Sequence, residues 1–268
     1  MKRTYMTTNL TDLNDLPRMN RWLFKEHSVD AVSQVGHILT RYRTFRALPI
    51  PEGGELYGAY NWRLTEHCWV EDPYKEGAEL SHGTALNEIW PADYNEIVGN
   101  PPNSDLRCDW GVSDNPNAHP PVMVFCNTRP DDDFKGKNLT INDGPFFRFV
   151  VSLRYPGGVP FGVGDEWFIN EFMPVVCQQD ELLRAFSFKA IPPPSSPFQR
   201  VLELWYRDSK AWKRNWVDTV PAIKKPDWET TSQRSPYLEP YKELVCIFLE
   251  EMPERDYLRD MSPYFSTF

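Results

Sequence analysis

The chain has 268 residues and a formal net charge of −9, which argues against a nucleic-acid groove because such a groove needs clustered Lys and Arg. The calculated isoelectric point is 5.1. No apolar run approaches the roughly 20 residues needed to span a bilayer, and Met1 leads into a polar stretch rather than a signal-peptide core. The 5 cysteines are scattered without a C-x-x-C spacing, so they indicate neither a disulfide framework nor a zinc site. We therefore expect a cytoplasmic protein that spans no membrane and binds no nucleic acid.

The first half of the chain alternates strand and helix patterns. Apolar residues recur at helical spacing from Leu16 to about Val35, with Asp15 as a candidate N-cap and Gly36 as a candidate stop. The β-branched and aromatic runs around this helix predict strands. The strands expected in this half are 3–10, 38–48, 57–70, 85–90 and 122–125, with a short helix at 94–98.

The second half repeats this order. A strand is predicted over 146–155, a helix from Glu166 onward that Pro174 should end or kink, and strands over 182–191 and 201–205. A short helix near 210–217 and a strand over 244–249 close the set.

Two short matches connect the halves. Trp22 and Glu26 in the first helix match Trp167 and Glu171 at a spacing of 145 residues, but His27 is answered by Phe172. The run 88–90 (Glu-Ile-Trp) matches 203–205 (Glu-Leu-Trp) at a spacing of 115, which places the segment 57–70 in an insertion of the first half.

The fold class expected from this order is α+β, with two ferredoxin-like βαββαβ units fused in tandem. Each unit has helices on only one face of its sheet, so the other face needs cover. Packing the two open faces together gives one intramolecular α+β barrel. We expect the first unit over 1–140, with the inserted strand and a long loop, and the second over 141–268.

The first helix that ends in Lys25-Glu26-His27, and the Glu-apolar-Trp strand before a short helix in both halves, resemble the EthD-like branch of the dimeric α+β barrel superfamily. This resemblance implies a fold whose members include cofactor-free isomerases, cyclases, decarboxylases and monooxygenases, and also haem-binding enzymes. Fold alone does not transfer a function.

His27 is the first candidate catalytic residue, similar in position to the histidine that closes the first helix of EthD-like proteins. An imidazole with a near-neutral pKa can exchange a proton with a bound small molecule. The alternative is a helix-end histidine bonded to a carbonyl. Its replacement by Phe172 in the repeat favours a functional role, because a symmetric structural need would tend to keep one residue in both halves.

Further candidates lie in the predicted strands. His67 and Tyr60 are candidate catalytic residues, although His67 and Glu66 would point to opposite faces of a strand and cannot pair with each other. Guanidinium groups bind planar anions, tyrosines can donate from a phenolic hydroxyl, and tryptophans line aromatic pockets, but salt bridges and core packing are the alternatives. The predicted substrate-binding residues are Arg41, Arg43, Tyr5, Tyr42, Trp62, Glu66 and Glu88.

The function expected from these features is a cofactor-independent lyase or decarboxylase that acts on a small aromatic, phenolic compound by general acid/base chemistry. No metal or nucleotide motif is present. The alternatives are a haem-dependent enzyme of the same barrel class, for which one axial histidine suffices, and a barrel that only binds a ligand. The expected partners are a small aromatic substrate and, as an option, a second copy of the chain.

Overall fold

The computed structural model describes residues 1–70, 90–100, 119–191, 197–229 and 232–260. The first sheet contains five strands in the order β10-β2-β3-β1-β4, and every neighbouring pair is antiparallel. The order β4-β1-β3-β2 is that of a ferredoxin-like unit. The strands are β1 (Lys2–Thr8), β2 (Leu39–Arg46), β3 (Arg63–Trp69), β4 (Val122–Asn127) and β10 (Arg255–Asp256).

The second sheet repeats the first. Its order is β5-β7-β8-β6-β9, so β6 to β9 occupy the places of β1 to β4. The strands are β5 (Asp132–Lys135), β6 (Phe147–Leu153), β7 (Leu182–Lys189), β8 (Arg200–Tyr206) and β9 (Leu244–Leu249).

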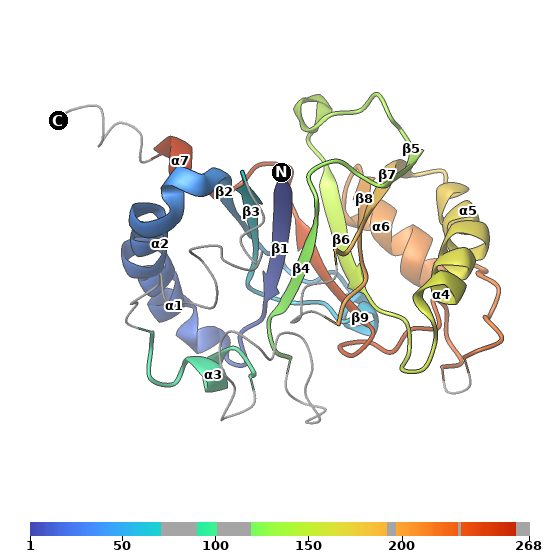
Figure 1. Cartoon of the computed structure of the whole chain (residues 1–268). Helices are drawn as coiled ribbons and strands as arrows, with labels where there is room; N and C mark the ends of the chain where they lie inside the picture. The colour runs from blue at the N-terminus through green and yellow to red at the C-terminus, as the bar shows by residue number, and fades with distance from the viewer. Residues whose placement is uncertain (71–89, 101–118, 192–196, 230–231, 261–268) are drawn as a thin grey trace.

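Helices cover the outer face of each sheet and leave the inner faces to each other (Figure 1). In the first unit, α1 (Leu16–Trp22), a π turn (Leu23–His27) and α2 (Ser28–Val35) form one continuous helix, as predicted. In the second unit, α4 (Phe161–Trp167), a π turn (Phe168–Phe172) and α5 (Met173–Cys177) form its counterpart. The two π turns lie 145 residues apart, which is the spacing that matched Trp22 with Trp167.

The remaining helices are short. They are α3 (Tyr94–Ile97), α6 (Ser209–Lys213) with the π turn Arg214–Asp218, and α7 (Tyr257–Asp260). Single 3₁₀ turns occur at Leu13–Asp15, Gly36–Ile38, Gly54–Tyr57 and Ile141–Asp143.

Equivalent hydrogen bonds close the two seams of the barrel. The Leu48 amide donates to the Phe248 carbonyl across 2.8 Å, and the Ile191 amide donates to the Phe125 carbonyl across 2.7 Å. Leu48 follows β2 and Ile191 follows β7, so each unit extends its second strand onto the fourth strand of the other. The α+β barrel predicted from the sequence is confirmed, and it closes within one chain.

Each half of the chain also gives a strand to the other half. β5 follows β4 along the chain but pairs with β7, and β10 follows β9 but pairs with β2. The predicted boundary at 140/141 falls between β5 and β6. The last strand of each predicted unit therefore lies in the sheet of its partner.

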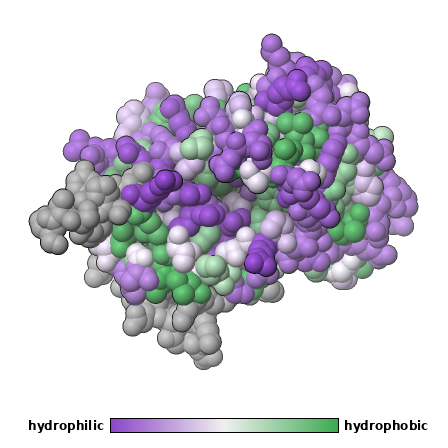
Figure 2. Space-filling view, turned by 90° about the horizontal axis from the view of Figure 1, so that it is seen from above, coloured by the Kyte–Doolittle hydropathy of each residue, from purple (hydrophilic) through white to green (hydrophobic). Residues whose placement is uncertain are grey.

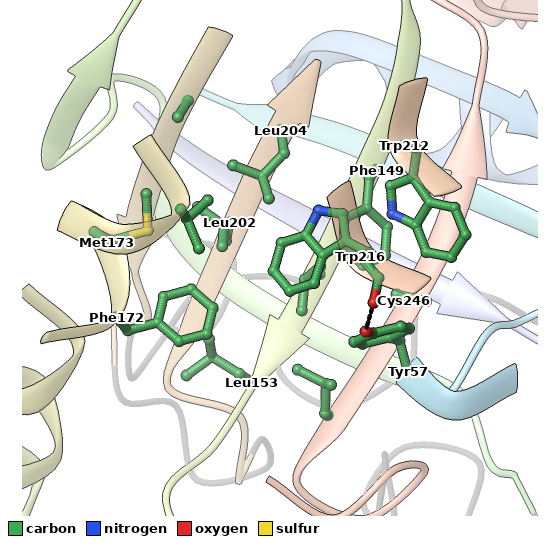
Figure 3. Packing of buried hydrophobic residues seen from close by; sticks show 14 of the residues in the cluster. Tyr57, Phe149, Leu153, Phe172, Met173, Leu202, Leu204, Trp212, Trp216 and Cys246 are labelled. Carbon is green, nitrogen blue, oxygen red and sulfur yellow. Dashed lines mark hydrogen bonds between the residues drawn. The ribbon is translucent and has the colours of Figure 1, made fainter. Parts of the chain in front are cut away.

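The apolar core is divided between the barrel interior and the helix-covered faces. Between the sheets, buried side chains of both units form one cluster that includes Phe45, Leu64, Val150 and Phe186. Under the helices of the second unit, aromatic and aliphatic residues fill the layer, and the Tyr57 hydroxyl donates to the Trp216 carbonyl there (Figure 3). The end of the molecule at the top of Figure 1 is mainly hydrophilic, with apolar patches toward the sides (Figure 2).

Two predictions about strands of the first unit were wrong. The segment 57–70 is not an insertion: it contains β3, which lies between β1 and β2 as β8 lies between β6 and β7. The true counterpart of Glu203 is therefore Glu66, since Glu66 pairs with Tyr5 as Glu203 pairs with Val150. Trp90 lies outside any strand, and 85–89 fall outside the described residues.

Pro174 does not end its helix. It lies at the start of α5, directly after the π turn, and the helix continues to Cys177. A proline is tolerated in a first turn because its missing N–H is not needed there.

Candidate functional site

The helix-facing layer, meaning the side chains between the helices and the outer face of a sheet, differs between the two units. Because Lys2 pairs with Trp69 as Phe147 pairs with Tyr206, and because the bulge between Leu39 and Arg41 recurs between Leu182 and Arg184, the positions can be matched one by one.

At eight matched positions the second unit is apolar and the first unit is polar or carries a tyrosine. Two of these pairs lie at the ends of the strands, Lys2 with Phe147 and Thr8 with Leu153. The other six pairs, first unit named first, are Thr4 with Phe149, His27 with Phe172, Ser28 with Met173, Tyr42 with Ala185, Thr65 with Leu202, and His67 with Leu204. Figure 3 shows apolar residues of this set, Phe149, Phe172, Met173, Leu202 and Leu204, packed in one layer. Buried polar groups lower stability unless they are hydrogen-bonded, so packing alone does not explain their presence here. We therefore take the helix-facing layer of the first unit as the candidate site.

His27 ends the π turn of the first helix and lies among aromatic rings. Its ring centroid is 4.8 Å from that of Trp22 and 5.3 Å from that of Trp90, and its exposed fraction is 8%. Trp22, Trp90 and Tyr94 also contact one another. The extra residue of a π turn is often found at functional sites, but here a π turn also occurs in the second unit, so the turn itself is architectural.

His67 lies on the helix-facing side of β3, the central strand of the sheet. Its ring centroid is 4.4 Å from that of Tyr42 and 5.5 Å from that of Trp69. Burial, with a smaller contribution from the charge of a protonated His27, lowers the pKa of His67 to about 3. The two imidazoles are therefore close enough to interact, and His67 is neutral at neutral pH. The side chain is only half-buried, so the layer is not fully closed over it.

Hydroxyl groups form the other part of the site. The Ser28 and Tyr42 hydroxyls are 3.2 Å apart, and Thr44 donates to the Tyr257 hydroxyl across 3.4 Å. The rings of Tyr42 and Tyr257 lie 4.5 Å apart. The sequence analysis missed Ser28, Thr44 and Tyr257. Ser28 was within reach of the repeat, since it lies 145 residues before Met173 and replaces an apolar side chain.

The structure thus brings together three predicted residues, His27, His67 and Tyr42, and places others elsewhere. Arg41 and Arg43 lie on the opposite face of β2, where Arg41 is 3.4 Å from Glu66 and Arg43 is 2.7 Å from Asp256. Both guanidinium groups are therefore paired with carboxylates.

Tyr60, Trp62 and Glu88 are also not gathered with His67. The Tyr60 hydroxyl donates to the Pro120 carbonyl across 2.7 Å, within the cluster between the sheets. Trp62 packs under the first helix and donates to Asn20 across 3.1 Å. Glu88 falls outside the described residues.

Tyr5 and Glu66 belong to a buried polar network between the sheets. Tyr5 donates to Glu203 of the other sheet across 2.7 Å and accepts from Arg3 across 2.9 Å. Arg3 lies 3.0 Å from Glu66, and Arg148 lies 3.0 Å from Glu203. These two ion pairs occupy matched positions, since Arg3 corresponds to Arg148 and Glu66 to Glu203. Their symmetry marks them as part of the barrel's architecture.

Within the described ranges, no group of three or more His, Cys, Asp or Glu side chains has an arrangement that could hold a metal ion. Among the same residues, no helix combines the length and apolar character needed to cross a membrane.

The fold and the polar layer together define an α+β barrel with a candidate site in one of two matched units. The model of the chalcone isomerase N-terminal domain matches residues 1–103, which include His27, Ser28, Tyr42 and His67. No curated protein sequence matches the chain.

Among solved structures, an anthrone oxidase-like protein aligns with 96% of this chain and 92% of its own at 10% identity, with a TM-score of 0.49. Chlorite dismutase from Candidatus Nitrospira defluvii, in complex with imidazole, aligns with 99% of this chain and 94% of its own at 8% identity and a TM-score of 0.41. An EthD family protein from Bacillus halodurans aligns with 26% of this chain and 69% of its own at 17% identity and a TM-score of 0.24. These likenesses are too distant to carry an argument about function.

Proposed function

We propose that this protein is a cofactor-independent enzyme that acts on a small phenolic compound by general acid/base chemistry in the helix-facing layer of its first unit. The observation that carries this proposal is the set of matched positions at which polar side chains or a tyrosine replace apolar ones. If this layer served only for packing, apolar residues like those of the second unit would be sufficient. The change to imidazole and hydroxyl groups provides proton carriers and hydrogen-bond donors inside an aromatic wall.

His27 is the residue proposed to carry the proton. It lies between Trp22 and Trp90, whose flat rings favour an aromatic ligand next to the imidazole. His67 is held neutral by burial, so it can give or accept a hydrogen bond without competing for the proton at neutral pH.

The reaction class follows from the similarity of residues 1–103 to the chalcone isomerase N-terminal domain. The sequence alone favoured a lyase or a decarboxylase. Acid/base chemistry is compatible with those reactions as well as with isomerisation. The similarity favours an isomerase acting on an unsaturated phenolic ketone. In such an isomerisation the phenolic oxygen adds to the conjugated C=C bond, a C–O bond forms as the π bond is lost, and the phenolic proton ends on the neighbouring carbon. No second reactant is needed, and one imidazole can move the proton. The EthD-like character of the first unit is likewise a proposal, which rests on Lys25-Glu26-His27. The helix that was expected to end at His27 continues to Val35.

A His27→Phe variant tests the proposal, because the matched position already holds Phe172. The variant should fold and lose turnover by roughly 10²–10⁴-fold, the contribution of a general acid or base. Turnover is measured with ortho-hydroxychalcone by loss of the chalcone absorbance, and folding by circular dichroism and thermal unfolding. Phe172→Leu in the second unit is the control and should keep activity. A folded His27→Phe protein with unchanged turnover would remove His27 from the mechanism.

A haem-dependent enzyme of the same barrel class is the alternative. His27 or His67 would supply the axial nitrogen, but the rings of Trp22 and Trp90 lie within 5.3 Å of His27 and that of Tyr42 lies 4.4 Å from His67. A haem plane on either imidazole would require these rings to move. A Soret band in protein purified from haem-replete cells would contradict the cofactor-independent proposal.

A further inference from the structure

Tyr257 reaches the candidate site from the far end of the chain. It begins α7, directly after β10, the strand that crosses from the second half to pair with β2 of the first unit. The side chain is 5% exposed, and its ring lies 4.5 Å from Tyr42 and 6.4 Å from Phe24. The site of the first unit is therefore completed by the tail of the second half.

The matched place in the second unit is apolar. Arg255 pairs with Thr44 as Asp132 pairs with Ser187, so Tyr257 corresponds to Phe134. Phe134 lies 6.2 Å from Phe168. An aromatic ring is thus sufficient for packing at this position, and the hydroxyl of Tyr257 is an addition found only in the unit that also carries the imidazoles.

The hydroxyl of Tyr257 has a proton to give. Its oxygen accepts from Thr44 across 3.4 Å. Burial raises its pKa, while hydrogen bonds from Ser28 and Thr44 act in the opposite direction. A tyrosine hydroxyl has one donor and two acceptor positions. Because Thr44 donates to this oxygen, the O–H of Tyr257 can donate to a further oxygen.

We propose that Tyr257 is a specificity-determining residue, whose hydroxyl donates to a phenolic oxygen of the aromatic substrate that lies away from its carbonyl group. This inference rests on the proposed function and deepens it. Tyr257 fixes the orientation of the ligand, while His27 carries the proton. Thr44 acts by donating to the Tyr257 oxygen, and so it is a positioning residue.

The test compares two probes that differ by one hydroxyl group, ortho-hydroxychalcone and the same molecule with an added para-hydroxyl. Binding is followed by quenching of tryptophan fluorescence, since Trp22, Trp69 and Trp90 lie in this layer. The wild-type protein should bind the dihydroxy probe more tightly, and Tyr257→Phe should reduce that preference by about 10-fold, the effect of one lost hydrogen bond to a buried group. Thr44→Val should reduce it less.

Tyr155→Phe is the matched control, because it removes a buried hydroxyl from the second unit, and it should leave the preference unchanged. Equal binding of the two probes by the wild-type protein, or full preference in a folded Tyr257→Phe variant, overturns the inference and leaves the His27 test unaffected. Failure of both probes to bind the wild-type protein overturns this inference together with the proposed substrate class.

Discussion

The two imidazoles of the candidate site, those of His27 and His67, have different surroundings although they interact. His67 is enclosed by the rings of Tyr42 and Trp69, and burial disfavours its charged form. His27 contacts indole rings from within the first helix, which continues to Val35. Because His67 is neutral, it is available for hydrogen bonding, while His27 is the residue proposed to carry the proton.

The low pKa of His67 predicts how stability depends on pH. An unfolded histidine has a pKa of about 6.5, whereas that of folded His67 is lowered to about 3. Between these values the unfolded chain binds more protons, so stability falls as the pH decreases from about 6.5 toward 3. Because His67 is half-buried, we expect a loss on the order of 1 kcal/mol between pH 7 and pH 5.

Urea unfolding of the wild-type protein and of His67→Leu at these two pH values measures this contribution. Leucine is the residue at the matched position, Leu204, and it cannot titrate. The variant should lose less stability on acidification than the wild-type protein does. Equal losses would show that His67 is not held neutral.

The sequence predicts those helices and strands that depend on interactions between residues close together in the chain. The amphipathic pattern and the spacing of 145 residues identified the two long helices because each helix depends on residues within a few turns. The third strand of the first unit was misplaced because its position depends on hydrogen bonds to β1 and β2, and Glu66 is followed by His67 where Glu203 is followed by Leu204. The edge strands β5 and β10 are 4 and 2 residues long and carry no pattern of their own.

The same reason explains what was missed in the site. His27 and Tyr42 lie within recognisable elements, and their chemistry could be proposed from residue type. Tyr257 enters the layer only because β10 crosses to the other sheet, a pairing that no local feature of the tail predicts. The site residues that could be proposed from the sequence, His27, Tyr42 and His67, all belong to the first unit.

Arg63 binds the segment 254–259, called the tail here, to the first unit. This arginine is 1% exposed, pairs with Glu254 and donates to Asn20 across 2.9 Å. Its counterpart in the second unit, Arg200, pairs instead with Asp132 and Asp165.

We therefore expect Arg63→Met to loosen the segment that carries Tyr257. Hydrogen exchange of amides in 254–259, followed by mass spectrometry, should accelerate by at least about 10-fold in the variant. The reason is that loss of the Arg63–Glu254 ion pair lowers the free energy needed to open this segment locally. Arg200→Met should loosen β5 and leave the tail unchanged. Identical exchange of the tail in both variants would show that Arg63 does not hold it.

The whole molecule depends on the polar network between the two sheets. Tyr5 from one sheet and Arg148 and Trp205 from the other all donate to Glu203, which is 2% exposed. Burial alone would raise the pKa of Glu203, but the charge of Arg148 and the hydrogen bonds from Tyr5 and Trp205 lower it below its ordinary value. The carboxylate thus joins the two sheets by a polar contact inside the barrel.

Removal of this carboxylate leaves the Arg148 charge buried and uncompensated. We expect Glu203→Leu to lower the free energy of unfolding by roughly 3–5 kcal/mol, and the double variant Arg148→Met, Glu203→Leu to lower it less than the single change does, because a buried pair lost together leaves no unpaired charge. Urea unfolding of both variants measures the difference, with Glu181→Ala, whose Arg214 pair is at the surface, as a control that should have little effect. A double variant less stable than Glu203→Leu would mean that the pair contributes more than charge compensation to the contact between the sheets.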